Sequence, residues 1–379
     1  MVGNMFYGTD GYMLMSDMGV QAYKGESSEL IMDERPERSL SGDGTSLHME
    51  NFLAACRSRN YKELHDEIAN AYLSASLCHL AAAGNRPDMA VSLDLLINAI
   101  VAGVLLGGFY AAVTVGITIS FGMLDIANIA QPAFILLGSY AAYILNSSFG
   151  VDPILVGIVM LPVFYVIGMA VYRLYYYSFE LRGEQSIQGL AFFFGLLFVA
   201  EVSLILVFGV DYRFVEARYI GPALHFGIFD LPLRMLIPCV VSLLMIGALQ
   251  LYLTRSFIGR AILAVSQDSL ALQLMAASPV RIKQIAVGIS VATCALAGTF
   301  LIIIQPVEPS IGRDYIGRIF AICVLGGMTS VPGMVAASLL IGIVESITAT
   351  FYGPSWAPAV AFGFLLVALA VRPAGLAGR

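Results

Sequence analysis

The chain has 379 residues, of which 59% are hydrophobic and 12% are charged, and its formal net charge is −6. The whole acidic surplus lies in residues 1–90, which carry seven Lys/Arg and thirteen Asp/Glu, whereas residues 91–379 carry thirteen of each sign. This composition excludes a single soluble domain and predicts a polar segment followed by a chain dissolved in lipid, with no nucleic-acid partner.

The first ninety residues are expected to form a small polar extension made of a loop and two helices. Glu26–Thr45 is rich in charge, Gly and Ser, which is typical of a loop or a disordered segment. Leu47–Ala83 places apolar side chains at helical spacing on two faces, with Asn60–Lys62 between the two expected helices.

The remainder is expected to be an all-α, polytopic membrane protein with about eight to ten transmembrane helices, because each crossing needs about 20 mostly apolar residues. Eight windows contain no Asp, Glu, Lys, Arg or His: Leu95–Leu124, Ile126–Val151, Pro153–Tyr172, Gln185–Ala200, Met235–Thr254, Gln284–Val307, Ile319–Val344 and Ser346–Val371. In the first window, Gly103 and Gly107 are four residues apart, a spacing that favours close helix packing.

The distribution of Lys and Arg predicts the orientation. Arg255–Lys283 holds four basic residues against one acid, so the positive-inside rule places it in the cytoplasm, and the basic end Arg372–Arg379 is expected there too. An even number of membrane crossings must then separate these two basic segments, although three apolar windows lie between them. One of the three windows must therefore be split into two elements. The break is expected at Gly326–Gly333, because Gly and Pro end helices.

Ionisable and amide side chains inside the apolar part are candidates for function, because they are costly in lipid. Asp125, Asn128 and Gln131 are spaced i, i+3 and i+6, which on a helix places them on one side, facing a translocation path or bonding to neighbouring helices. Glu201 is expected at an interface or a cavity, and Glu345 at the end of a span.

No catalytic residue, metal site or cofactor is expected. A P-loop needs Gly-Lys-Ser/Thr, and none of the three lysines follows a glycine. The five cysteines are scattered, and the four histidines form no metal-binding pair. Any ATP hydrolysis must therefore come from another polypeptide.

The cytoplasmic segment predicts a short amphipathic helix. Asp268 or Ser269 can cap it, and Leu270, Leu274 and Met275 form an apolar stripe. Such a helix either rests on the membrane surface or docks into a cytoplasmic partner.

The same segment resembles the coupling region of bacterial ABC-importer permeases of the branched-chain amino-acid family. The residues that carry the resemblance are Gly259, Arg260, Ala261, Ala264, Val265, Gln267, Asp268 and Ala271. The chain departs from the family pattern at Leu263, which replaces a basic residue, and at Ala277-Ser278.

Further motifs extend this resemblance over residues 93–378. They are Gly107–Ala112, Gly116–Thr118, Phe121-Gly122, Asn128–Ala130, Val324–Val335, Leu340–Glu345, Arg372-Pro373 and Gly375-Leu376. Gln131-Pro132 stands where the family usually has His-Gly, which removes a titratable side chain.

The resemblance implies that residues 93–379 are the permease domain of a binding-protein-dependent importer in the bacterial inner membrane, for branched-chain or related small amino acids. It implies three partners besides membrane lipid: cytoplasmic ATP-binding subunits, a periplasmic or lipid-anchored solute-binding protein, and a second permease, homologous or identical. Gly259, Arg260, Gln267, Asp268, Ala271 and Met275 would then form the ATPase-coupling loop. The alternatives are a secondary transporter driven by an ion gradient through Asp125 or Glu201, and a membrane-tethered oxidoreductase.

Residues 1–85 resemble the C-terminal end of Gfo/Idh/MocA-type oxidoreductases. The residues that carry the resemblance are Gly8–Met13, His48–Leu53, Cys56–Arg59 and Leu73–His79. The glycine-rich nucleotide loop and the catalytic Lys of that family have no counterpart, so a remnant from gene fusion or a mis-joined reading frame is expected, joined by a linker at 86–92. A native product starting near Met89, measured by intact mass, would rule out the fusion.

Overall fold

The computed structural model divides the chain into two compact units, residues 1–90 and 91–379. It describes residues 3–7, 11–16, 19–24, 29–34 and 57–58 of the first unit. In the second unit it describes residues 93–371, apart from 125, 127, 183–186, 218, 222, 227–228 and 275–276.

The first unit contains a four-stranded antiparallel sheet in which consecutive strands are neighbours: β1 (Gly3–Tyr7), β2 (Gly11–Ser16), β3 (Gly19–Lys24) and β4 (Glu29–Glu34). The expected loop at Glu26–Thr45 is therefore wrong where β4 forms. β4 is an edge strand, where charged side chains are common, and the ladder uses backbone groups that any composition supplies. Of the two expected helices, the described residues include only 57–58, which are helical.

The second unit is a helical bundle, as the sequence predicts. Its longer helices are α3 (Leu93–Ile117), α4 (Gln131–Phe149), α5 (Pro153–Ser178), α6 (Ile187–Phe208), α7 (Leu233–Arg255), α10 (Pro279–Ile304) and α12 (Val331–Phe351). Its shorter elements are the π-helix η2 (Thr118–Met123), η3 (Glu180–Arg182), β5 (Ala223–Phe226), β6 (Phe229–Pro232), α8 (Phe257–Gln267), α9 (Ser269–Leu274), α11 (Gly312–Gly326), η4 (Pro354–Trp356) and α13 (Ala357–Val371).

In the described part of the chain, six helical segments are long and apolar enough to cross a membrane: α3 with η2, α5, α6, α7, α10 and α12. The other apolar windows correspond to α4, which has 19 residues, and to α11 and α13, which have 15 each. The all-α, multi-pass architecture is thereby confirmed for this unit.

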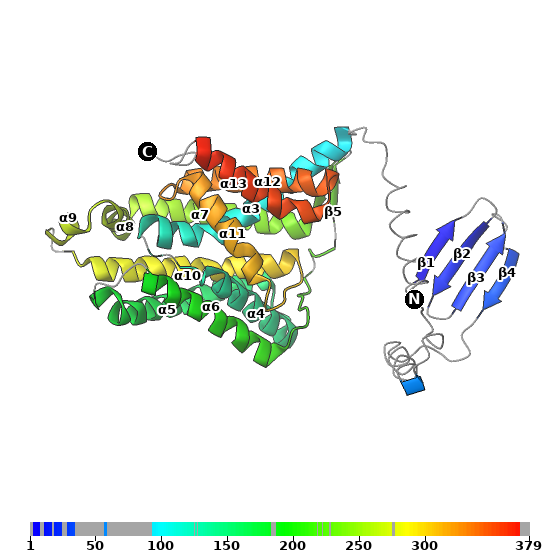
Figure 1. Cartoon of the computed structure of the whole chain (residues 1–379), viewed down its shortest axis with the longest axis horizontal. Helices are drawn as coiled ribbons and strands as arrows, with labels where there is room; N and C mark the ends of the chain where they lie inside the picture. The colour runs from blue at the N-terminus through cyan, green and yellow to red at the C-terminus, as the bar shows by residue number, and fades with distance from the viewer. Residues whose placement is uncertain are drawn as a thin grey trace. The chain divides into compact units, whose positions relative to one another are not determined.

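Helix α10 is the central element of the bundle. Figure 1 shows it between a layer that contains α4, α5 and α6 and a layer that contains α3, α7, α11, α12 and α13. Its most apolar window is 83% buried, against 22% for α5 and for α6. The outer faces of α5 and α6 therefore present apolar side chains to the surroundings of the bundle.

The break expected near Gly326–Gly333 is confirmed. Helix α11 ends at Gly326, α12 begins at Val331, and Gly327 has a φ of +88°, a conformation that favours glycine. Four helices, α10 to α13, therefore follow the basic segment, of which α10 and α12 are long and apolar enough to cross a membrane. The number of crossings after this segment stays a prediction. The predicted span end at Glu345 is wrong, because Glu345 lies inside α12.

Candidate translocation and coupling site

A cluster of buried polar side chains lies where the chain passes from α3 to α4. Asn128 and Gln131 are 0% and 1% exposed. Asn128 Nδ2 donates to Gln131 Oε1 at 3.4 Å, and Gln131 Nε2 donates to the Ser290 carbonyl at 3.4 Å. Ser290 Oγ donates to the Gly116 carbonyl at 2.6 Å. The cluster therefore joins α3, α4 and α10 in the protein interior.

The local fold of this segment is a broken helix. The chain is π-helical over Thr118–Met123, and the described residues between Met123 and Gln131, where α4 begins, are not helical. Pro132 lies in the first turn of α4, where its fixed φ favours a helix start. Interrupted helices leave backbone groups free, and in membrane proteins they occur where the chain is buried or lines a cavity.

The expected arrangement of three polar side chains on one helical face is therefore wrong. Asn128 lies in the non-helical chain before α4, and Asp125 lies outside the described residues. Asn128 and Gln131 nevertheless meet, because the chain turns and the Gln131 N–H donates to the Asn128 carbonyl at 3.3 Å. Their role in translocation stays a prediction.

Two buried oxygens of this region, Thr114 Oγ1 and Asn128 Oδ1, have no hydrogen-bond partner among the described residues. An unpaired buried polar atom costs about 1–3 kcal/mol, so native proteins keep few of them. Such atoms are suited to a site where a polar solute or water supplies the missing hydrogen bond.

The basic segment Arg255–Lys283 contains two short helices, α8 and α9. The expected short helix is present as α9, with Asp268 directly before it, and Met275 lies outside the described residues. Figure 1 shows α9 beyond α8, at one end of the helical bundle, and its Leu274 is 83% exposed. An exposed apolar side chain at this tip is suited to contact with a partner.

Helix α8 was not expected from the sequence. The Ser256 side chain accepts a hydrogen bond from the Gly259 N–H at 2.9 Å, which caps the helix. Ile262 and Val265 are buried, while Arg260 and Gln267 are exposed. The signal that was missed is apolar spacing at helical period, carried by Ile258, Ala261, Ile262 and Val265.

Helix α8 lies against the broken helix. A cavity of about 350 Å³ is lined by Ser266 and Gln267 of α8, by Met123 at the end of η2 and by Ser330 before α12, among others. A Cβ added to Gly122 of η2 would lie 1.6 Å from the Met328 carbonyl oxygen, so these two segments touch through their backbones. Helix α8 and the interrupted part of α3 are therefore neighbours across this cavity.

Two carboxylates inside the helices are paired with arginines of α11. Glu345 is 2% exposed; it accepts a hydrogen bond from the Tyr110 hydroxyl and one from Arg318 Nε at 3.0 Å. Glu201 binds Arg313 at 2.7 Å. These partners were missed, because Arg313 and Arg318 lie in the short charged interval between two apolar windows and no spacing connects them to Glu201 or Glu345.

The opposite end of the bundle from α9 is held by the segment between α6 and α7. Asn146 at the end of α4 exchanges two hydrogen bonds of 3.0 Å with the Glu216 backbone. The Tyr219 hydroxyl donates to Asp152 at 3.2 Å, and burial together with that carboxylate raises the pKa of Tyr219. A cavity of about 500 Å³ opens beside Arg213 and Glu216.

These features define a multi-pass membrane transport protein: apolar helices surround a broken helix with buried polar groups, and an amphipathic helix pair lies at one end. Residues 99–369 match the family described as the branched-chain amino acid transport system / permease component, and the chain belongs to this family. It is accordingly a transporter subunit of the inner (plasma) membrane.

Several relatives are similar over most of their own length. The chain is 28% identical to the high-affinity branched-chain amino acid transport system permease protein BraD of Pseudomonas aeruginosa, over 77% of this chain and 98% of that protein. It is 25% identical to LivH of Escherichia coli (73% and 94%) and 24% identical to a probable LivH of Methanocaldococcus jannaschii (69% and 86%). No solved structure matches.

Proposed function

We propose that this chain is the transmembrane permease subunit of a binding-protein-dependent ABC importer for branched-chain or related small amino acids. The observation that carries the proposal is the contact between α8 and the broken helix, whose polar cluster lies in the interior of the bundle. Separate ATP-binding subunits dock on α8 and α9, and their closure moves these helices. The interrupted part of α3 then changes the side of the membrane to which the path beside Asn128 and Gln131 opens.

A periplasmic or lipid-anchored binding protein would deliver the solute at the opposite end, near the cavity beside Arg213. Importers of this class work with two permeases, so a homologous second permease or a self-dimer completes the assembly. The ATPase activity belongs to the partner subunits, since no lysine of this chain follows a glycine.

Affinity purification through a C-terminal tag, from native membranes in mild detergent, tests the assembly. Mass spectrometry is expected to find an ATP-binding subunit with the permease and to report whether one permease or two are present. Repeated recovery of the chain alone would favour the gradient-driven alternative. Against that alternative, the Glu201 carboxylate is already paired with Arg313 at 2.7 Å.

Arg260→Glu is expected to uncouple ATP hydrolysis from uptake. Arg260 is exposed on α8, so its reversal leaves the bundle intact while it inverts the charge that α8 offers to a docking partner. We expect labelled leucine uptake by the reconstituted complex to fall at least about tenfold, which is the effect of roughly 1.4 kcal/mol at an interface. Arg260→Lys keeps the charge and should retain most of the uptake. Unchanged coupling in Arg260→Glu would exclude this contact.

Gly116→Ala is expected to impair uptake, because it displaces the polar cluster at Gln131. An added Cβ would lie 2.0 Å from Gln131 Nε2 and 2.7 Å from the Ser290 carbonyl, so the Gln131 amide must move. We expect leucine uptake to fall about tenfold or more, because the polar cluster loses its geometry. Gly195→Ala is the matched control, since nothing lies within 4 Å of its added Cβ. Normal uptake by Gly116→Ala would remove the cluster from the path.

We also propose that residues 1–85 are a unit of separate origin, as their composition suggests. The family match begins at residue 99, so this unit lies outside it. Intact mass of the native product is the measurement that tests this proposal.

A further inference from the structure

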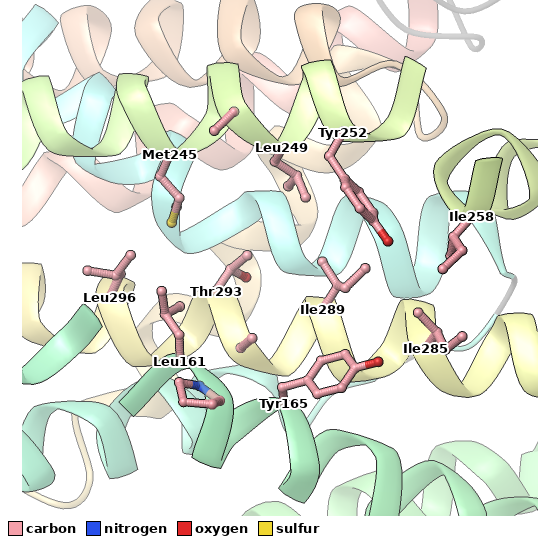
Figure 2. A pocket seen from close by; sticks show the side chains of 13 residues that line it. Leu161, Tyr165, Met245, Leu249, Tyr252, Ile258, Ile285, Ile289, Thr293 and Leu296 are labelled. Atoms are coloured by element: carbon pink, nitrogen blue, oxygen red, sulfur yellow. The ribbon is translucent and has the colours of Figure 1, made fainter. Parts of the chain in front are cut away.

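An apolar groove lies between α5, α7 and α10 (Figure 2). It has a volume of about 510 Å³. Thirteen side chains line it, and only Tyr165, Tyr252 and Thr293 among them carry an oxygen. Such a surface offers few hydrogen bonds to a polar solute, so the groove differs in chemistry from the polar cluster at Gln131.

The length of the groove corresponds to one leaflet of a bilayer. Its lining on α10 runs from Ile285 to Leu296, which is about 16 Å at the rise of an α-helix. This distance is about half of the roughly 30 Å hydrocarbon core. The groove also includes Ile258 of α8, so it begins at the cytoplasmic end of the bundle.

Two arginines continue the lining at that end. Arg255 follows Tyr252 by three residues on α7, and Arg281 precedes Ile285 by four residues on α10, so each shares a helix face with groove residues. Both side chains are exposed, and neither forms a salt bridge with a described residue. Figure 2 shows the Tyr165 and Tyr252 rings toward the same end, where tyrosines favour the membrane interface.

We propose that this groove binds an anionic phospholipid of the cytoplasmic leaflet. One acyl chain lies along α10, and the phosphate lies between Arg255 and Arg281. Basic residues between transmembrane helices on the cytoplasmic side are suited to anionic headgroups.

The bound lipid would contact both parts of the transport site. At the cytoplasmic end it touches Ile258 of α8. At the inner end it reaches Thr293, whose hydroxyl donates to the Ser290 carbonyl at 2.7 Å, the same carbonyl that accepts from Gln131. The inference concerns binding alone and does not rest on the proposed import function.

Native mass spectrometry of the full-length protein tests the headgroup site. The delipidated protein is titrated with phosphatidylglycerol and with phosphatidylcholine of the same acyl chains. We expect at least about tenfold tighter binding of phosphatidylglycerol, and loss of this preference in Arg255→Gln/Arg281→Gln. Arg234→Gln, at the other end of α7, should keep it. Equal binding of the two lipids, or an unchanged preference in the double variant, would overturn the proposal.

A pair of neighbouring substitutions tests the acyl-chain site. Ala248→Trp places an indole in the groove, whereas Gly247→Trp points into open space, with nothing within 4 Å of the added Cβ. We expect the first to abolish retention of phosphatidylglycerol and the second to leave it unchanged. Retention in Ala248→Trp that equals the Gly247→Trp control would show that the lipid lies elsewhere.

Discussion

Arg318→Leu is expected to lower the free energy of unfolding by about 3–5 kcal/mol, which is the effect of removing one partner of a buried ion pair. Arg318 Nε donates to Glu345 at 3.0 Å, and the Glu345 side chain is 3% exposed. Without the guanidinium, a carboxylate stays buried, and its remaining hydrogen-bond partner among the described residues is the Tyr110 hydroxyl. Thermal unfolding in detergent should show a clear fall in Tm.

Two controls separate charge from packing in this experiment. Arg318→Leu/Glu345→Gln removes both charges, and the glutamine oxygen can still accept from Tyr110, so we expect most of the stability to return. Asp211→Ala removes an exposed partner of Arg213, at 3.8 Å with the Asp211 side chain 80% exposed. An exposed pair contributes about 0–1 kcal/mol, so Tm should hardly change. A wild-type Tm in Arg318→Leu would contradict the account.

Gly342→Ala is expected to disrupt the contact between α3 and α12. An added Cβ would lie 2.5 Å from the Gly107 nitrogen and 2.6 Å from the Gly103 carbonyl oxygen, and both neighbours are backbone atoms that cannot rotate away. Small residues allow membrane helices to approach this closely. We expect a loss of about 1–3 kcal/mol or more, because overpacking forces the two backbones apart.

The matched control is Gly247→Ala on α7, where nothing lies within 4 Å of the added Cβ. Alanine has a higher helix propensity than glycine, so this variant should be neutral or more stable by up to about 1 kcal/mol. Opposite signs for the same chemical change would establish that the α3–α12 contact, and not helix propensity, decides the outcome. If Gly342→Ala were as stable as wild type, the close crossing would be excluded.

Local pattern predicted much of the bundle. The apolar windows mark its helices, the Gly and Pro residues near Gly326–Gly333 mark the break before α12, and α9 begins directly after Asp268. The close spacing of Gly103 and Gly107 predicted helix packing, and Gly342 of α12 lies against both. These features depend on the transfer of apolar side chains from water to lipid and on local backbone conformation. Both are determined by residues that are close together in the sequence.

Local pattern did not predict the polar contacts. Glu345 was expected to end a span, because an unpaired carboxylate is costly in lipid. Its partners could not be identified from the sequence. Arg318 is distant in sequence from Tyr110, and no spacing rule connects the two residues through Glu345. The segment at Asn128 was expected to be helical, although its backbone turns before α4.

The sequence by itself determined that the chain after residue 93 is a helical membrane protein and to which permeases it is similar, because composition and short motifs are local properties of the chain. Only the tertiary structure decided which carboxylate meets which arginine, that Asn128 and Gln131 meet Ser290, and that α8 lies against the broken helix. These contacts join segments far apart in the chain, and their geometry follows from how the helices pack, which no local pattern encodes.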